Sequence, residues 1–249
     1  MAKLKLEHVK KYVEENIEEF HERRYESLKR LKFSKILTKK NPYLFKAKNI
    51  LTAHELVQNL LDAHLSSQEE GIFGEFLEGL SIFVCGKVFN GQKSAAQGID
   101  LEFIRKSIKY IVTIKSGPNW GNADQIRKMK ENFRIAKRIL SANKSISNIV
   151  AINGCCYGRD ANSDKGEYMK ICGQEFWEFI SNNSKLYLEI IEPLGSKAKE
   201  RNEKFFISYG ELLTVFTQQF TNEFCIKGKI DWNKLVKYNS GKEKMKVNL

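Results

Sequence analysis

An aspartate and a lysine in two neighbouring predicted strands are the residues of this chain best suited to do chemistry. Asp100 lies within residues 98–103, and Lys115 ends residues 108–115, whose apolar and polar side chains alternate with the period of a strand. If the strands pair as a hairpin, Asp100 and Lys115 converge. A carboxylate can hold Mg²⁺, and an adjacent lysine can orient a water and stabilise negative charge developing on phosphorus. The chemistry indicated is metal-assisted hydrolysis of a phosphodiester bond.

The composition favours a polyanionic partner. The 249 residues include 42 basic and 30 acidic side chains, for a net charge of +12, and 42% are hydrophobic. This content is enough for one substantial core, so we expect one catalytic domain with appendages. Nucleic acid is the first candidate for the partner, and a basic surface that only keeps the protein soluble is the alternative.

Other sequence features exclude several classes of protein. The five cysteines show no zinc-ligand spacing, and we interpret them as reduced thiols. The N-terminus leads into a charged amphipathic stretch, and the longest apolar run, near residues 80–85, is far too short to span a bilayer. We therefore expect a cytoplasmic protein without a membrane segment.

The chain divides into three predicted parts. Residues 1–40 form a helical N-terminal arm, because apolar residues between Leu6 and Phe20 recur every three or four positions. The pair Asn41-Pro42 ends this arm, since a proline disfavours a helical conformation of the residue before it. Residues 41–238 form the catalytic and DNA-binding domain, and residues 239–249 a frayed, lysine-rich tail. The apolar face of the arm could dock on a partner subunit.

Hydroxyl residues followed by glutamate three positions later predict helix starts at Thr52, Ser67 and Ser208. The order predicted around the two strands is helix, strand, strand, helix, strand, with the last strand at residues 149–152. Further on, we predict a helix over 174–180, a strand over 186–191 and a helix over 208–224. The fold class is therefore α/β, a mixed sheet flanked by helices.

This order resembles the core of the PD-(D/E)XK nuclease superfamily. Gly98-Ile-Asp100 followed by Thr113-Ile-Lys115 matches its pattern of an aspartate on one strand and a lysine closing the next. The downstream helix and strand complete its αβββαβ order if one short strand has escaped detection. The resemblance implies Mg²⁺ as the cofactor, with Asp100 and Lys115 at the active centre.

A closer resemblance covers roughly residues 40–240. The phrases at residues 41–49, 98–103, 114–122 and 154–158 look like those of type II restriction endonucleases, in particular the PmeII type. The resemblance implies a homodimer that cuts both strands of double-stranded DNA at a short, near-palindromic site and leaves 5′-phosphate and 3′-hydroxyl ends.

One position departs from the superfamily pattern, because Thr113 stands where an acidic residue usually precedes the lysine. A neutral hydroxyl is a poorer metal ligand, so either the metal site has one carboxylate fewer or another acid substitutes. The resemblance places a glutamate on the helix before the strands, which makes Glu78 the first candidate, with Glu75 nearby. Glu102, on the same strand face as Asp100, is third, and Glu131 is fourth.

The backbone carbonyl oxygen of Ile114 is a further candidate metal ligand, because Mg²⁺ also binds carbonyl oxygens. Each acidic residue has an ordinary alternative as a solvated charge, and Glu102 could equally pair with a lysine.

Two polar segments are candidates for DNA contact. The first segment follows the strand that ends at Lys115, and the second follows the strand predicted over 149–152. The residues expected to contact DNA are Ser116, Asn119, Trp120, Asn122, Gln125 and Arg127 in the first segment, and Tyr157, Arg159 and Lys165 in the second. A structural turn with a buried Trp120 is the alternative for the first segment, and solvated loop residues for the second.

Two other functions remain compatible with the sequence. One is a DNA-binding protein in which Thr113 marks a decayed metal site. The other is a nuclease of the same fold that acts in repair or on particular DNA structures.

Overall fold

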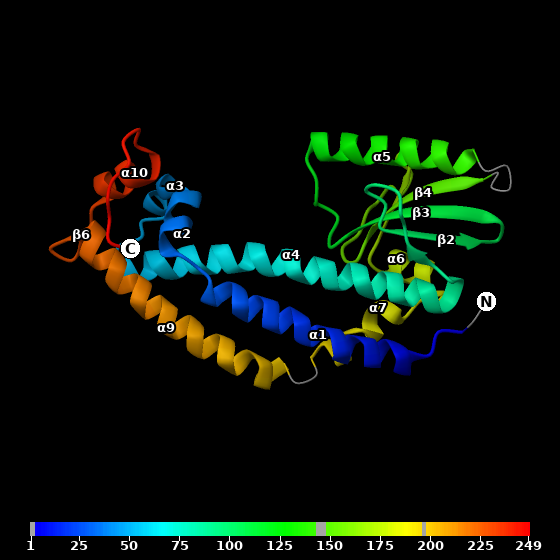
Figure 1. Cartoon of the computed structure of the whole chain (residues 1–249), viewed down its shortest axis with the longest axis horizontal. Helices are drawn as coiled ribbons and strands as arrows, with labels where there is room; N and C mark the ends of the chain where they lie inside the picture. The colour runs from blue at the N-terminus through cyan, green and yellow to red at the C-terminus, as the bar shows by residue number, and fades with distance from the viewer. Residues whose placement is uncertain (1–2, 143–147, 196–197) are drawn as a thin grey trace. The chain divides into compact units, whose positions relative to one another are not determined.

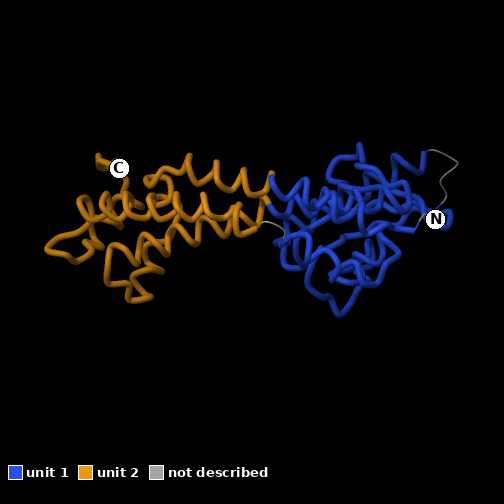
Figure 2. Tube along the Cα trace, turned by 90° about the horizontal axis from the view of Figure 1, so that it is seen from below, with its two compact units in different colours: residues 1–18, 73–196 blue, residues 19–72, 197–249 orange. Residues whose placement is uncertain are grey.

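The computed structural model describes residues 3–142, 148–195 and 198–249. The chain divides into two compact units, residues 1–18 with 73–196 and residues 19–72 with 197–249 (Figure 2). Helices α1 (Leu6–Lys29) and α4 (Ala53–Phe89) contribute to both units. The boundaries of the units therefore fall within helices, and not at the proline that ends the predicted arm.

A five-stranded mixed sheet forms the centre of the first unit (Figure 1). Its strands, in spatial order, are β1 (Gln92–Lys93), β2 (Leu101–Arg105), β3 (Ile108–Lys115), β4 (Ile149–Cys155) and β5 (Met169–Cys172). The pairs β1·β2 and β2·β3 are antiparallel, whereas β3·β4 and β4·β5 are parallel. The predicted α/β fold is confirmed, and β1 is a short strand that the sequence did not reveal.

The predicted hairpin is present. Its second strand has the predicted limits, whereas the first begins at Leu101 instead of residue 98, so that Asp100 lies immediately before β2. Leu101 pairs with Val112, and the turn is closed by Lys106 and Ser107, both with positive φ. Positive φ at both central residues is the turn geometry that matches the right-handed twist of paired strands.

Helix α5 (Ala123–Ser141) covers one face of the sheet, and α6 (Gln174–Ser181) lies on the other (Figure 1). Met129, Phe133 and Ala136 of α5 are buried in a cluster that includes Ile111 of β3. On the opposite face, Phe179 of α6 meets Phe103 and Tyr110. Every second residue of β3 therefore faces α5, including Thr113.

The prediction of a strand over residues 186–191 is wrong. This segment forms two short helices, α7 (Leu186–Glu189) and α8 (Ile191–Leu194). Leu186 and Ile190 are buried, whereas Leu188 between them is 57% exposed. Apolar residues four positions apart occupy one face of a helix, so the alternation at residues 186, 188 and 190 was misleading.

Helix starts were predicted correctly at Thr52 and wrongly at Ser67 and Ser208. The Thr52 hydroxyl accepts a hydrogen bond of 3.1 Å from the amide of Glu55, at the start of α4. Ser67 lies inside α4 and donates to the carbonyl of Ala63, and Ser208 lies inside α9 (Ala198–Phe224). The hydroxyl of a serine inside a helix can instead donate to a carbonyl of the preceding turn. A hydroxyl residue followed by glutamate three positions later therefore does not by itself mark the start of a helix.

The N-terminal arm is two helices, α1 and α2 (Phe33–Lys39). Val9, Val13 and Ile17 of its predicted apolar face have at most 2% of their surface exposed. The chain itself therefore covers this face, which is not free for a partner subunit as expected.

The second unit is built mainly from helices. These are α9, α2, α3 (Pro42–Ala47), α10 (Trp232–Ser240) and parts of α1 and α4, with a hairpin of β6 (Cys225–Ile226) and β7 (Lys229–Ile230). Its core includes Phe33, Phe45 and Phe220. Asn239 donates to the carbonyl of Leu37 at 2.6 Å, and Val247 and Leu249 pack against the same core. The residues of the expected tail thus make defined contacts in the structure.

Candidate active site

Asp100 is held directly against strand β3. Its amide donates to the carbonyl of Val112 at 2.9 Å, and its Oδ2 accepts a hydrogen bond of 2.6 Å from the amide of Ile114. These two bonds place the Asp100 carboxylate one residue away from Lys115 on the strand. The carboxylate is therefore positioned by main-chain geometry and does not depend on a flexible side-chain partner.

Glu78 approaches the same place from helix α4. A Cβ added to Gly74, one turn earlier, would lie 3.8 Å from the Cβ of Ser116, which shows that α4 passes the end of β3. The pKa of Glu78 is raised, first by burial and then by the negative charge of Asp100. The charges of Lys93 and Lys115 act in the opposite direction. Asp100 and Lys115 are thus both close enough to Glu78 to influence the ionisation of its carboxyl group.

Lys93 of β1 is a member of this group that the sequence analysis missed. Its Nζ lies 3.6 Å from Oε1 of Glu78. The signal that could have found it is the short strand β1, which aligns residue 93 with Leu101 beside Asp100. Two carboxylates and two ammonium groups therefore meet at this edge of the sheet.

The donor set fits Mg²⁺. Asp100 and Glu78 are two carboxylates close enough to influence each other's charge, and the described ranges contain no group of three or more His, Cys, Asp or Glu side chains that could hold a metal ion. Mg²⁺ is commonly bound in proteins by one or two carboxylates and completes its shell with water and phosphate oxygens. Burial raises the pKa of Glu78 most and the charge of Asp100 raises it further, and a bound cation would offset the repulsion between the two carboxylates. The carbonyl of Ile114 is a further oxygen beside Asp100.

The other acidic candidates differ in their surroundings. Glu75 lines the same surface hollow as Glu78 and Lys93. Glu102 accepts hydrogen bonds from Gln92 and Ser94 and lies 3.3 Å from Nζ of Lys109. The alternative that Glu102 pairs with a lysine is therefore the one observed.

Glu131 lies on α5 and pairs with Arg134 at 3.3 Å, with 47% of its side chain exposed. It belongs to a group of ion pairs on that helix, which includes Arg134 and Glu167.

Thr113 occupies a sealed position under helix α5. Only 2% of its surface is exposed, and its hydroxyl oxygen accepts a hydrogen bond of 3.2 Å from Nδ2 of Asn153. The same oxygen lies 3.5 Å from the sulfur of Met129. Asn153, its register partner on β4, is 1% exposed. The Thr113 hydroxyl therefore has its partners in the protein interior.

The buried amide of Asn153 also reaches the loop after β3. Its Oδ1 accepts a hydrogen bond of 3.1 Å from the indole N–H of Trp120. Nζ of Lys115 in turn lies 5.4 Å from the centroid of the Trp120 ring, within the range of a cation–π interaction. Thr113, Asn153 and Trp120 thus form a polar chain that ends beneath Lys115, and we call it the Trp120 support. Sequence analysis missed Asn153, although an asparagine directly after the apolar residues of 149–152 is an unusual strand residue.

Residues 116–122 combine a structural turn with the beginning of α5. Trp120 is partly buried and packs against the cluster around Phe133. The side chains of Asn122 and Gln125 bond each other's amides at 3.0 Å, which is a capping box at the start of α5. Arg127 pairs with Asp124 at 2.8 Å. Four of the side chains assigned to DNA contact therefore already have partners within the protein: Trp120, Asn122, Gln125 and Arg127.

The loop after β4 is fastened to residues 116–122. Tyr157 is 54% exposed, and its ring lies where a Cβ on Gly117 would be. Gly158 has a φ of +87°, and a Cβ there would lie 2.6 Å from the ring of Pro118. Only glycine adopts this conformation readily, so the contact requires Gly158.

Asp160 holds the same loop through two lysines. It pairs with Lys165 at 2.9 Å and with Lys170 of β5 at 3.1 Å. Hydrogen bonds from Lys165, Lys170 and the amide of Asn162 keep the pKa of Asp160 well below its usual range. Lys165, assigned to DNA contact from the sequence, is therefore engaged by Asp160, while Arg159 lines the adjacent hollow with Trp177.

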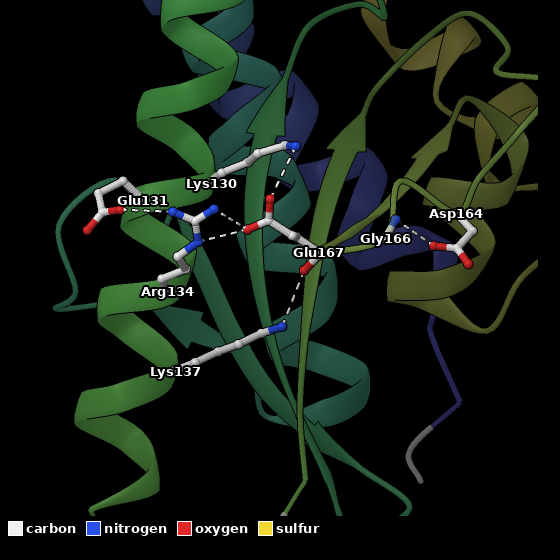
Figure 3. A network of polar contacts seen from close by, with 7 residues as sticks. All are labelled: Lys130, Glu131, Arg134, Lys137, Asp164, Gly166 and Glu167. Atoms are coloured by element: carbon white, nitrogen blue, oxygen red, sulfur yellow. Dashed lines mark hydrogen bonds and ion pairs between the residues drawn. The ribbon is translucent and has the colours of Figure 1, made fainter.

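Glu167 fastens the far end of this loop to α5 (Figure 3). Its carboxylate pairs with Lys130 at 3.2 Å and Arg134 at 2.8 Å, and its carbonyl accepts from Lys137 at 3.3 Å. The hydrogen bond from Lys130 is the largest cause that lowers the pKa of Glu167. Glu131 completes the group through Arg134. Residues 157–168 are therefore held at both ends.

Comparisons with known proteins identify the family of this chain. No curated protein matches the sequence. No helix in the described ranges is long and apolar enough to cross a membrane. Residues 7–202, which are most of the chain, match the family described as type II restriction endonuclease EcoO109I. The chain therefore belongs to this family of type II restriction endonucleases, which are site-specific deoxyribonucleases acting on DNA.

Proposed function

We propose that Asp100, Glu78 and Lys115 form the active centre of a Mg²⁺-dependent nuclease of the PD-(D/E)XK kind. The enzyme cleaves double-stranded DNA at a short specific site and leaves 5′-phosphate and 3′-hydroxyl ends. The observation that carries the proposal is the meeting of two carboxylates and a lysine at the end of β3, where Asp100 and Lys115 both act on the pKa of Glu78.

Each residue has a distinct role in this proposal. Asp100 and Glu78 hold the metal ion, with the carbonyl of Ile114 as an additional oxygen. When bound, Mg²⁺ polarises the phosphate and lowers the pKa of the attacking water. Lys115 orients that water and stabilises the negative charge that develops on the phosphate.

Thr113 contributes to catalysis without touching the metal. Its buried hydroxyl begins the Trp120 support, and the indole face lies beneath the ammonium group of Lys115. A lysine side chain has a flexible four-carbon stem and loses rotamer freedom when it is held in one place. The Trp120 support reduces the remaining disorder of Lys115, so Thr113, Asn153 and Trp120 are positioning residues.

DNA is contacted in this proposal by the two loops that flank the active centre. Ser116 and Asn119 offer donors to phosphate oxygens, and Tyr157 and Arg159 lie on the second loop, which the contacts of Asp160 and Glu167 hold in place. A fixed loop is preorganised for recognition, because less conformational entropy is lost on binding.

Cleavage of both strands is most simply achieved by two copies related by a twofold axis. We therefore propose a homodimer. Light scattering on the free protein and on its DNA complex tests this, and a monomer in both states would contradict it.

The active-site assignment is tested by plasmid cleavage in Mg²⁺. Lys115→Ala and Asp100→Ala should each lower the cleavage rate by about 10² or more, while DNA affinity changes little. Asp124→Asn, an exposed acid on α5, and Lys11→Ala, an exposed lysine, are controls that should cleave at the wild-type rate. Wild-type cleavage by both Lys115→Ala and Asp100→Ala would show that the active centre lies elsewhere.

A further inference from the structure

One segment of the second unit carries a large, uncompensated positive charge. Residues 27–54 contain no aspartate or glutamate. The basic residues in this interval are Lys29, Arg30, Lys32, Lys35, Lys39, Lys40, Lys46 and Lys48. The segment therefore supplies much of the net charge of +12 from only a small part of the chain.

Folding directs these lysines outward. Phe33, Ile36 and Leu37 form the buried side of α2, and Phe45 anchors α3 in the same core. The lysines lie outside this core: Lys32, Lys35, Lys39, Lys46 and Lys48 are exposed, and Lys40 is partly exposed. We call this surface, formed by the lysines of residues 32–48, the basic surface.

The protein provides little to neutralise the basic surface. Lys29 and Arg30, which precede it, both pair with Glu26. The lysines of residues 32–48 form no ion pair with any acidic residue in the described ranges. Their contacts are with neutral groups: Lys40 donates to the carbonyl of Ala63, Lys48 donates to Asn59, and Lys46 lies over the ring of Trp232.

The charge is strong enough to affect a neighbouring ionisation. The pKa of His64 is lowered, first by burial and then by the charges of Lys40 and Lys39. The two lysines disfavour a further positive charge on His64, and by the same electrostatic effect they favour an anion beside the basic surface.

We propose that the basic surface binds the phosphate backbone of duplex DNA. These contacts are additional to those at the active centre, and the inference rests on DNA being the substrate. Lys35 and Lys39, four residues apart, lie along one side of α2, and Lys32 is the extended N-cap residue directly before this helix. At about 1.5 Å per residue, Lys35 and Lys39 are separated by about 6 Å along the helix axis. This separation is close to the rise of about two nucleotides of one strand.

Such contacts carry affinity but no sequence information. Each lysine that neutralises a phosphate releases counterions, and the affinity then falls with salt. The basic surface would therefore hold DNA whatever its sequence, while the loops of the first unit remain responsible for recognition.

The test uses the full chain with Lys32→Gln, Lys35→Gln and Lys39→Gln combined. Binding to a fluorescent duplex is measured without Mg²⁺ over a range of salt concentrations. The slope of log affinity against log salt should become shallower by about 0.9 for each phosphate that the variant no longer neutralises. The cleavage rate at saturating DNA should stay at the wild-type value, and so should the melting temperature, because none of the three side chains is buried.

A matched control removes three other lysines, with Lys10→Gln, Lys199→Gln and Lys204→Gln combined. These lysines lie among glutamates in α1 and α9. The charge change is identical, so equal slopes for the two triple variants would overturn the proposal. Loss of binding to vesicles of anionic phospholipid, with DNA binding unchanged, would also overturn it and identify a membrane as the partner.

The outcome is separate from that of the proposed active site. If the wild type cuts DNA and the basic-surface variant binds it normally, only the present inference fails. If Lys115→Ala cuts at the wild-type rate while the basic-surface variant has a shallower salt slope, the active-site assignment fails and the basic surface stands.

Discussion

The indole N–H of Trp120 donates a hydrogen bond of 3.1 Å to the side-chain oxygen of Asn153, a residue that is 1% exposed. The other end of the same amide donates to Thr113. Both ends of Asn153 are therefore occupied, which fixes the plane of its amide. The Trp120 ring is fixed with it, directly below the ammonium group of Lys115.

Fluorination of Trp120 should lower the cleavage rate in steps. Fluorine withdraws electron density from the ring and weakens a cation–π interaction, while the indole N–H remains able to bond Asn153. An exposed cation–π pair contributes about 0.5–1 kcal/mol, so the most fluorinated ring should cut about two- to fivefold more slowly. Single-turnover rates with fluorotryptophans incorporated at position 120 alone measure this. A rate independent of fluorination would limit Trp120 to packing.

Asn153→Ala should affect both stability and catalysis. It leaves the Thr113 hydroxyl and the Trp120 N–H without their partner, and an unsatisfied buried polar group costs about 1–3 kcal/mol. Urea unfolding should show this destabilisation, and kcat should fall more than DNA affinity. A double-mutant cycle with Thr113→Val checks the pairing, since the two effects should not add. Additive effects would mean that the two residues act independently.

Glu78→Gln should abolish cleavage and yet stabilise the metal-free protein. The pKa of Glu78 is raised in the folded state, so the folded protein binds the proton more tightly than the unfolded chain. Ionisation of Glu78 therefore costs stability as the pH rises through the raised pKa. The neutral amide removes this cost, and the melting temperature at pH 7 should rise by up to a few degrees.

Mg²⁺ provides the second measurement for this variant. Mg²⁺ should raise the melting temperature of the wild type but much less that of Glu78→Gln, because a ligand is removed. Glu131→Gln, on an exposed part of α5, is the control and should cleave almost normally. Normal cleavage by Glu78→Gln would instead transfer the ligand role to Glu75 or Glu102.

Asp160→Asn should loosen the loop after β4. The folded-state pKa of Asp160 lies below its unfolded value, so its ionisation stabilises the fold above about pH 4, and this contribution disappears as the pH falls further. At pH 7 the variant should melt at a lower temperature than the wild type, and the difference should shrink in acid. Asp164→Asn, whose carboxylate accepts from the nearby amide of Gly166, is the control. A difference independent of pH would show that charge is not the cause.

The local sequence was sufficient to predict the elements around Asp100 and Lys115. The alternation of apolar and polar residues at 108–115 predicted β3 with its observed limits. The start of α5 is fixed by hydrogen bonds between Asn122 and Gln125, which are three residues apart in the sequence. The side-chain alternation of a strand and the cap of a helix both depend on residues close together in the sequence, so they can be recognised without the tertiary structure. The pairing of the strands that carry Asp100 and Lys115 also followed from the sequence, because a hairpin brings adjacent strands together.

Only the tertiary structure decided which acid joins Asp100 and what Thr113 does. Glu75, Glu78, Glu102 and Glu131 have the same chemistry, and their roles depend on how α4 passes the sheet and where lysines from other elements lie. Asn153 is 40 residues from Thr113 and 33 from Trp120, yet β3 and β4 place it between them. The sequence by itself determined the two strands of the hairpin and placed Asp100 and Lys115 near each other. The second carboxylate, the Trp120 support and the helical conformation of residues 186–194 depend on packing between distant segments, which no local pattern encodes.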